Sequence, residues 1–141
     1  MDTTKSRFLK IDEDTIYDSL TSLTWLARDS QLTLEKEVSW DEAEAFVKQI
    51  NGQKTGGHDN WRLPTVQEAS SLYDPAKLNK DANGGDIHLD PIFPPGAGNC
   101  TWTSQVRGQE AQILFYVNGC PYWYEKNDKT ISHAARLVRR D

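Results

Sequence analysis

The start of the chain carries short apolar runs separated by polar breaks, which is a pattern typical of β-strands. Phe8 begins the first run, and the acidic triplet at 12–14 that follows it is typical of a turn. Two further apolar runs begin at Thr15 and at Leu23. The pattern therefore predicts three strands, at residues 8–9, 15–17 and 23–27.

The pattern then changes to the period of an amphipathic helix. Ser39 fits the N-cap position, and Glu42 follows three residues later, as in a capping box. Apolar residues at positions 43, 46, 47 and 50 have the i, i+3, i+4, i+7 spacing of one helix face. The Asn-Gly pair at 51–52 is a common helix end. We therefore predict a helix that begins after Ser39 and ends near this pair.

A second capping box predicts a shorter helix further along the chain. Thr65 is followed by Glu68, and the apolar residues at 69, 72 and 73 form one side of a helix that ends at Asp74-Pro75. Residues 74–99 then hold four of the six prolines and four of the nine glycines, without periodicity. This composition predicts a long irregular loop, and loops of such length are often functional.

The last third of the chain returns to the pattern of strands. Residues 101–106 and 111–117 flank a turn at 107–110, which together predict a hairpin. A short aromatic run follows at 121–124, and residues 131–139 are predicted to form a closing strand.

Composition narrows the class of protein. The chain has 141 residues, which suits one domain spanning residues 1–141. Its 5 Trp, 5 Tyr and 4 Phe can build a core and argue against a disordered chain. The longest uncharged apolar run, at 113–117, is far shorter than the roughly 20 residues that span a bilayer, so we expect no membrane insertion.

The charge is acidic and uneven. A net charge of -5 argues against a nucleic-acid-binding protein, which is normally basic. Residues 1–60 carry 7 basic and 12 acidic side chains, whereas residues 100–141 carry 6 and 4. No apolar segment follows the polar N-terminus, so we expect no signal peptide and either a cytoplasmic protein or a domain excised from an exported one. The sequence leaves the oligomeric state open.

Several segments spread over the chain resemble a known family. The most specific is Asp59-Asn60-Trp61-Arg62-Leu63-Pro64-Thr65, with Glu68 after it. The other matching segments are Leu23-Thr24-Trp25, Ser39-Trp40-Asp41-Glu42-Ala43, Asp90-Pro91-Ile92-Phe93-Pro94, Trp102-Thr103-Ser104 and Arg136-Leu137-Val138-Arg139. Together they resemble the bacterial domain family named after the C-terminal domain of the Legionella collagen-like adhesin.

The resemblance implies an α+β, C-type-lectin-like fold related to the core of the formylglycine-generating enzyme. In that fold two helices pack on small antiparallel sheets, long irregular loops connect them, and both termini lie in one sheet. Family members are usually binding modules of secreted or surface proteins, and the named adhesin binds sulfated polysaccharides. We therefore expect a non-enzymatic module that recognises a protein or glycan surface through its C-terminal strands and the 74–99 loop.

The aromatic run at 118–126 is the strongest candidate for a binding face. Tyr and Trp are rigid, combine an apolar body with a polar tip, and are enriched in binding hot spots. All three aromatic residues of this run are candidates for the binding face. The alternative, because side chains alternate along a strand, is that Trp123 points into the core while Tyr122 and Tyr124 face outwards. The candidate ligand-binding residues are Gln105, Arg107, Asn118, Tyr122, Tyr124 and Lys126.

No cofactor is expected, although one loop has the residues of a weak calcium site. Asp81, Asn83, Asp86 and Asp90 place oxygen side chains around glycines, which resembles half of a calcium loop. A plain polar loop is the alternative. The three histidines are far apart and the cysteines form no Cys-x-x-Cys pair, so zinc is not expected.

The sequence leaves open whether the two cysteines are bonded to each other. It also leaves open a second class of function that would use one of them. If the C-terminal hairpin turns near Gly108, Cys100 faces position 118, close to Cys120. A disulfide between them is one outcome, and unbonded thiols are the other. A degenerate enzyme of the related oxidase fold that uses one cysteine is the main alternative function. An accessory or target subunit of a larger assembly is the third.

Overall fold

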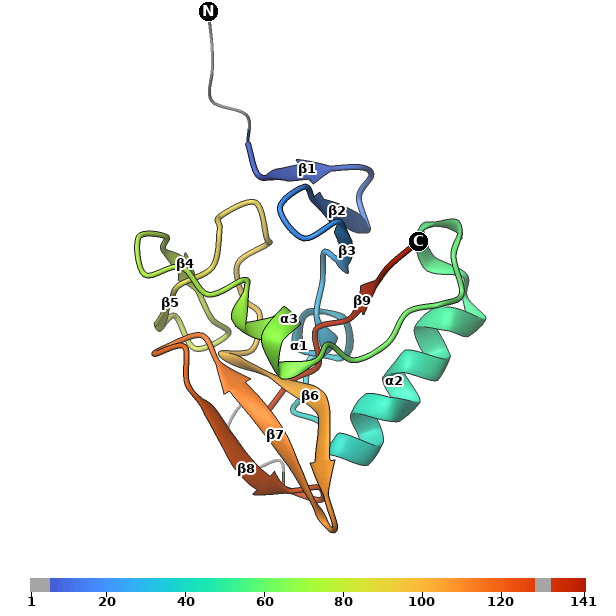
Figure 1. Cartoon of the computed structure of the whole chain (residues 1–141), viewed down its shortest axis with the longest axis vertical. Helices are drawn as coiled ribbons and strands as arrows, with labels where there is room; N and C mark the ends of the chain where they lie inside the picture. The colour runs from blue at the N-terminus through green and yellow to red at the C-terminus, as the bar shows by residue number, and fades with distance from the viewer. Residues whose placement is uncertain (1–5, 129–132) are drawn as a thin grey trace, which may run out of the picture.

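The computed structural model describes residues 6–128 and 133–141. Its four-stranded sheet is antiparallel, with neighbouring strands in the order β1 (Phe8–Lys10), β2 (Thr15–Asp18), β3 (Leu23–Leu26) and β9 (Val138–Arg139). Strands from the beginning and the end of the chain therefore lie in one sheet, as expected (Figure 1). Helices and small antiparallel sheets together make an α+β protein.

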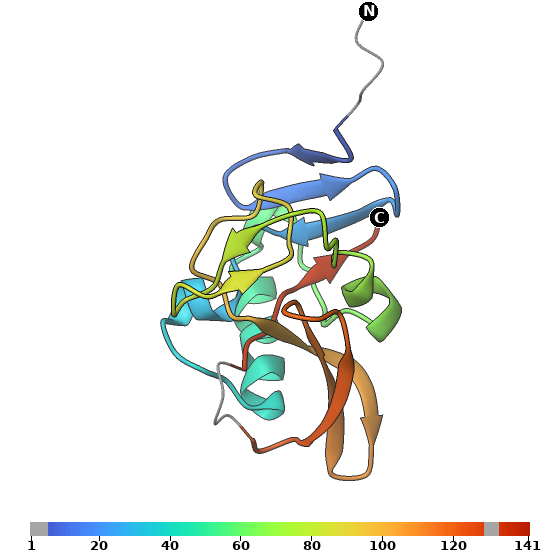
Figure 2. The same ribbon diagram turned by 90° about the vertical axis from the view of Figure 1, so that its left-hand side faces the viewer.

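A second, three-stranded sheet lies at the opposite end of the molecule (Figures 1 and 2). Its antiparallel strands are β6 (Cys100–Arg107), β7 (Glu110–Phe115) and β8 (Pro121–Glu125). The 74–99 segment, predicted to be irregular, also contains a small hairpin of β4 (Asn79–Lys80) and β5 (Asp86–Ile87). Strands of two residues are too short to show an alternating pattern in the sequence.

The two predicted helices begin where their capping boxes indicate. In α2 (Trp40–Gly52), Ser39 and Glu42 exchange hydrogen bonds of 3.0 and 3.2 Å, and α3 (Val66–Ser70) begins in the same way. The sequence pattern does not predict α1 (Ser30–Leu34) or the 3-10 helix η1 (Thr55–Gly57), because each is too short for a helical period. Among the described residues, no helix has the length and apolar character needed to cross a membrane.

The core consists of two clusters of buried side chains. The first lies between the four-stranded sheet, α3 and the 87–93 segment, and its large members are Phe8, Ile16, Leu23, Trp25, Leu72, Ile87, Leu89, Phe93, Leu114 and Tyr116. The second lies between α2 and the three-stranded sheet, and its large members are Leu26, Phe46, Ile50, Trp61, Leu63, Trp102, Ile113 and Leu137. Three of the five tryptophans are therefore buried core residues.

The predicted closing strand at 131–139 is wrong in extent, because only Val138 and Arg139 pair as a strand. Residues 131–132 lie outside the described part of the chain, whereas all seven residues from 133 to 139 are buried. Their backbone groups bond to several elements instead of one neighbouring strand. The carbonyls of His133, Ala134, Ala135 and Leu137 accept hydrogen bonds of 2.9 Å from the backbone amides of Val38, Trp102, Ser30 and Leu26, respectively.

The turn between β7 and β8 packs against the end of α3. Gly119 has a φ of +74°, and a Cβ placed there would lie 2.7 Å from Cδ2 of Tyr73. In the same region the Tyr116 hydroxyl donates a hydrogen bond of 3.1 Å to the carbonyl of Ala69. The close approach at Gly119 therefore helps to fix the three-stranded sheet to the helical layer.

We expect Gly119→Ala to lower the free energy of unfolding more than Gly108→Ala does. Both glycines have positive φ, which costs an alanine roughly 1–2 kcal/mol. Only the alanine at 119 meets a neighbour, since nothing lies within 4 Å of a Cβ at Gly108. Overpacking of this kind adds about 1–3 kcal/mol. Urea unfolding of the two variants and the wild type measures the difference, and equal losses would contradict the packing role of Gly119.

Candidate functional site

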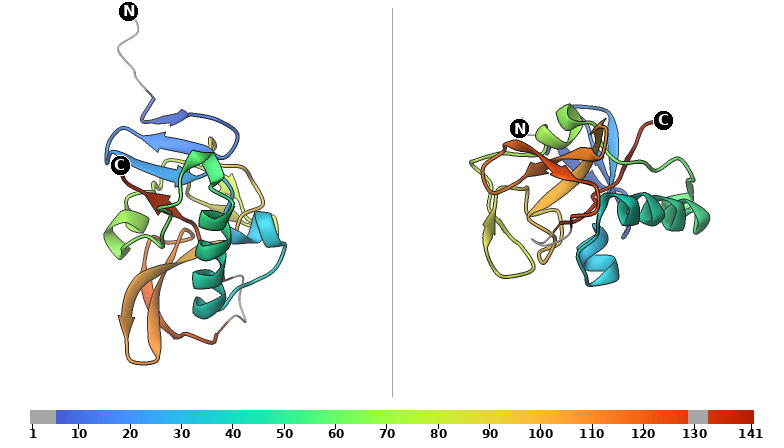
Figure 3. Two further views of the ribbon diagram at one scale, coloured as in Figure 1. Left: turned by 90° about the vertical axis from the view of Figure 1, so that its right-hand side faces the viewer. Right: turned by 90° about the horizontal axis from the view of Figure 1, so that it is seen from below.

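The predicted binding residues lie mainly on the outer part of the three-stranded sheet. Strand β6 is buried as far as Thr103 and exposed from Ser104 to Arg107. Its register with β7 shifts between Trp102 and Val106, where the Thr103 hydroxyl donates a hydrogen bond of 2.8 Å to the Gln112 carbonyl. We call residues 104–113 and 121–126 the distal sheet. It projects from the body of the molecule on the side opposite the four-stranded sheet (Figures 1 and 3).

One face of the distal sheet carries an arginine on a tryptophan ring. Arg107 and Glu110 are cross-strand neighbours, and Arg107 Nε donates a hydrogen bond of 2.8 Å to Glu110 Oε1. The Arg107 guanidinium carbon lies 4.2 Å from the centroid of the Trp123 ring. An ion pair and a cation–π contact therefore hold this exposed arginine in one orientation.

The opposite face of the distal sheet presents Tyr122. This side chain is 46% exposed, and its ring meets Phe115 edge to face at a centroid distance of 5.6 Å. In the adjoining turn, Asn118 Nδ2 donates a hydrogen bond of 3.4 Å to the Tyr122 hydroxyl oxygen. The side-chain oxygen of Asn118 accepts a hydrogen bond of 3.0 Å from the Cys120 backbone amide. The structure therefore brings two of the predicted residues, Asn118 and Tyr122, together.

Trp123 and Tyr124 have orientations opposite to those of the alternating arrangement considered from the sequence. Tyr124 lies opposite the fully buried Ala111, and its ring centroid is 4.9 Å from that of the buried His133. Trp123 lies opposite Gln112 on the outer face, beneath Arg107. The alternative in which Trp123 points into the core while Tyr124 faces outwards is wrong. Alternation along β8 places the two side chains on opposite faces, but it does not determine which face is covered.

The remaining two predicted residues lie apart from Arg107 and Tyr122. Gln105 is exposed and lies at the register shift of β6, where its backbone amide donates a hydrogen bond of 3.2 Å to the Thr103 hydroxyl. Lys126 Nζ lies 4.7 Å from the centroid of the Trp40 ring at the start of α2. The six predicted residues therefore do not converge on one point, and the exposed ones are spread over both faces of the distal sheet.

The 61–65 segment and Glu68 support the fold, because their side chains and backbone bond to other parts of the protein. Trp61 is 2% exposed, and its indole donates a hydrogen bond of 3.0 Å to the Thr55 carbonyl. Arg62 forms a bidentate pair with Glu68, with N–O distances of 2.7 and 2.9 Å. The backbones of Arg62 and Val138 exchange two hydrogen bonds. This segment therefore joins α3 to the buried end of the chain.

The family model of the Lcl C-terminal domain matches residues 14–139. The chain belongs to the Lcl C-terminal domain family. Searches of the curated proteins and of the solved structures gave no match.

The calcium candidate of this Lcl C-terminal domain is not assembled as a cation site. Asp81 Oδ1 accepts hydrogen bonds from two backbone amides at 2.8 Å each. Asp86 pairs with Lys80, and Asp90 lies 3.8 Å from Lys77 Nζ. In the part of the chain that the structure describes, no three His, Cys, Asp or Glu side chains are grouped to hold a metal ion. The loop is held instead by its own backbone amides and lysines.

The two cysteines are not bonded to each other, which is the second of the two outcomes that the sequence left open. Because of the register shift in β6, Cys100 lies opposite Phe115 instead of position 118. Its side chain is buried, and burial raises the pKa of the thiol to about 12. Cys120 is exposed in the turn, where Sγ lies 3.6 Å from the Asn118 carbonyl oxygen.

We expect the pair of Arg62 and Glu68 to contribute pH-dependent stability. Hydrogen bonds from Arg62 hold the pKa of Glu68 below its ordinary value, although burial opposes this shift. A lowered carboxyl pKa stabilises the folded state above the unfolded value of about 4.3, and this stabilisation is lost as the pH falls through the folded pKa. Glu68→Gln should therefore lower the free energy of unfolding at pH 7 by about 1.5–3 kcal/mol.

Unfolding measurements at several pH values test the direction of this pH dependence. The difference between wild type and Glu68→Gln should shrink as the pH falls from the unfolded value of about 4.3 through the lower folded pKa of Glu68, below which the carboxyl group is protonated in both states. Glu37→Gln, at an exposed position, is the control for loss of one charge. A pH-independent difference, measured by denaturant unfolding, would show that the ion pair contributes no stability.

Proposed function

We propose that this Lcl C-terminal domain is a non-enzymatic binding module of the adhesin-like kind, and that the distal sheet binds a protein surface. The observation that carries the proposal is the projecting sheet with aromatic side chains on both faces. Trp, Tyr and Arg are the residue types most enriched in binding hot spots. The fixed Arg107 side chain loses little conformational freedom on binding, which favours affinity.

The distal sheet is rigidly attached at its base. The Ser104 amide donates a hydrogen bond of 2.8 Å to the Pro64 carbonyl, at the entry to α3. At the other edge, the Trp40 amide donates a hydrogen bond of 2.7 Å to the Lys126 carbonyl. Both helices therefore support the sheet. A partner can bind the exposed part without first ordering it.

The charge of the distal sheet favours a protein partner over a sulfated glycan. Arg107 is paired with Glu110, and Glu125 lies opposite Glu110 on the neighbouring strand. With Lys126 as its second basic residue, the distal sheet carries two basic and two acidic side chains, so it has no net positive charge to attract a polyanion. The exposed apolar residues Val106 and Tyr122, by contrast, suit the apolar core of a protein interface. In this proposal the 74–99 loop lies outside the main contact.

The cysteines give little support to the alternative enzymatic function. A thiol with a pKa of about 12, such as that of Cys100, holds almost no thiolate at neutral pH. Cys120 lies in the turn outside the distal sheet, so Cys120→Ser is expected to leave binding unchanged. A role as an accessory or target subunit of a larger assembly is compatible with the same face and differs only in the identity of the partner.

Replacing Trp123 by alanine should weaken binding by about tenfold or more, because truncated hot-spot residues commonly have effects of this size. The measurement is biolayer interferometry against separate panels of immobilised proteins and polysaccharides from surfaces that the source organism contacts. Leu20→Ala is the matched control, since Leu20 is 73% exposed and lies at the opposite end of the molecule.

Thermal unfolding must show that both variants keep the fold. Equal binding by Trp123→Ala and Leu20→Ala would overturn the proposed face. Binding confined to the polysaccharide panel, and lost in Trp123→Ala, would keep the face but replace the protein partner with a glycan.

A further inference from the structure

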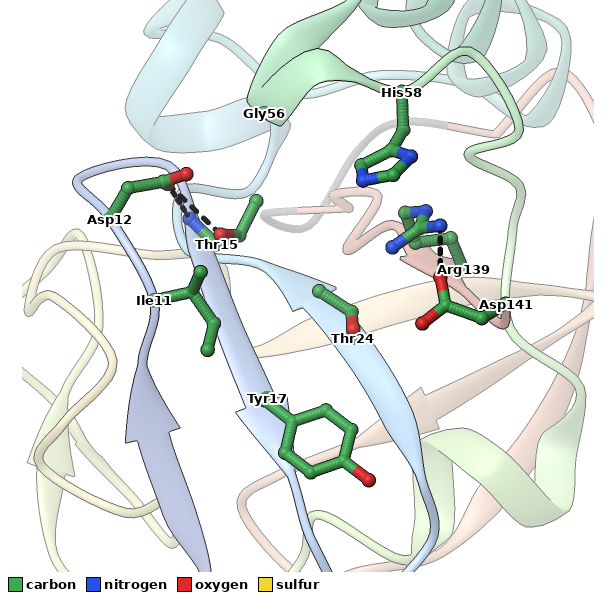
Figure 4. A pocket seen from close by; sticks show the side chains of 9 residues that line it. All are labelled: Ile11, Asp12, Thr15, Tyr17, Thr24, Gly56, His58, Arg139 and Asp141. Atoms are coloured by element: carbon green, nitrogen blue, oxygen red, sulfur yellow. Dashed lines mark hydrogen bonds and ion pairs between the residues drawn. The ribbon is translucent and has the colours of Figure 1, made fainter.

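A small pocket lies on the outer face of the four-stranded sheet, far from the distal sheet. Its volume is about 260 Å³. Tyr17, Thr24 and Arg139 are cross-strand neighbours on β2, β3 and β9 and form its floor. Figure 4 shows the β1–β2 connection on one side of the hollow and His58, Arg139 and Asp141 on the other. The lining residues are Ile11, Asp12, Thr15, Tyr17, Thr24, Gly56, His58, Arg139 and Asp141.

The cationic group at the floor of this pocket is an arginine that is almost fully buried. The Arg139 side chain is 6% exposed, and its Nε donates a hydrogen bond of 2.8 Å to Asn60 Oδ1. Its guanidinium carbon lies 6.0 Å from the centroid of the Trp61 ring. The aromatic ring and the amide fix the position of the guanidinium but do not neutralise it. A buried cation of this kind requires a negative partner.

The negative partner of Arg139 is the side-chain carboxylate of Asp141, which is exposed enough to move away. Asp141 pairs with Nη2 of Arg139, although the Asp141 side chain is 83% exposed. An exposed carboxylate regains full hydration when it moves away, so its pairing adds little stability. The arginine, in contrast, stays buried. The pocket therefore has a fixed cation and a replaceable carboxylate.

The rest of the pocket limits the size and charge of a ligand. Ile11 is 56% exposed and, with the half-buried Tyr17, provides an apolar wall beside the polar floor. The Asp12 carboxylate lies on the rim, where its Oδ1 accepts hydrogen bonds of 2.8 and 2.9 Å from the amides of Asp14 and Thr15. A second negative charge on the ligand would be repelled by Asp12. These features suit a small molecule with one carboxylate and a short apolar tail.

We propose that this pocket binds small monocarboxylates, with the carboxylate on Arg139 and the tail against Ile11. Asp141 occupies the carboxylate position in the unliganded protein and competes with the ligand. Removing this internal competitor raises the fraction of protein that can bind. If Asp141 occupies the arginine for about 80–90% of the time, affinity rises about 5- to 10-fold when its charge is lost.

The test is a titration of the full chain with sodium butyrate, followed by ¹H–¹⁵N NMR at constant ionic strength. Butyramide is the uncharged isostere, and sodium sulfate is the doubly charged anion. We expect saturable shifts around Thr24 and Arg139 with butyrate but not with butyramide or sulfate. Asp141→Asn should tighten butyrate binding about 5- to 10-fold. Glu37→Gln, which removes a distant exposed charge, should leave it unchanged.

A further variant tests the contribution of the ligand's apolar tail separately from that of its carboxylate. Ile11→Ser should weaken binding of butyrate but not of acetate, and the exposed position of Ile11 favours retention of the fold. The absence of saturable shifts with butyrate, in both wild type and Asp141→Asn, would overturn the proposal. So would equal tightening in Asp141→Asn and Glu37→Gln, because that result would indicate a general effect of net charge.

Discussion

Seven consecutive buried residues, 133–139, hold the elements of this protein together. Backbone amides and carbonyls that are buried must find hydrogen-bond partners within the protein. Because this segment crosses the core outside any long strand, its partners come from β3, α1, β6 and the loops before α2 and α3. Each of those elements is therefore positioned by the same segment. The four-stranded and three-stranded sheets lie at opposite ends of the molecule, and both form backbone hydrogen bonds with this segment.

The buried pair of Asp29 and Arg136 reinforces this attachment with charge. Arg136 is 1% exposed, and its Nη2 lies 4.0 Å from Asp29 Oδ2. Burial raises the pKa of Asp29, although the positive charge of Arg136 opposes the shift. Asp29 also caps α1 and accepts a hydrogen bond of 2.8 Å from the Gly98 amide. Loss of either member would leave the other charge buried without its partner, which is strongly destabilising. The pair thus ties α1 and the end of the 74–99 segment to the core.

The predictable part of this fold is the part whose causes are local. A capping box lies within four residues, so the starts of α2 and α3 could be located from Ser39 and Thr65. The register of β6 depends on the Thr103 hydroxyl and the Gln112 carbonyl, which are nine residues apart. The inward face of β8 depends on the packing of Tyr124 against His133. The family signature located the segments that build the core, whereas it gave no signal for the pocket at Arg139. That pocket depends on pairing between β3 and β9, which are distant in sequence.

The buried segment also determines how the pocket at Arg139 can exchange its carboxylate. Arg139 follows Leu137 and Val138, both fully buried, and Val138 exchanges backbone hydrogen bonds with Arg62. Movement of the guanidinium by a shift of β9 would therefore disturb the contacts of the whole segment. Asp141 has no comparable burial, so rotation of its exposed side chain is the low-energy path. A ligand that enters the pocket would replace Asp141 while the sheet stays fixed. Because β6 is joined to the same segment through Trp102 and Ala134, the geometry of the distal sheet is preserved as well. The pocket and the distal sheet are thus two surfaces that are attached to the same buried segment.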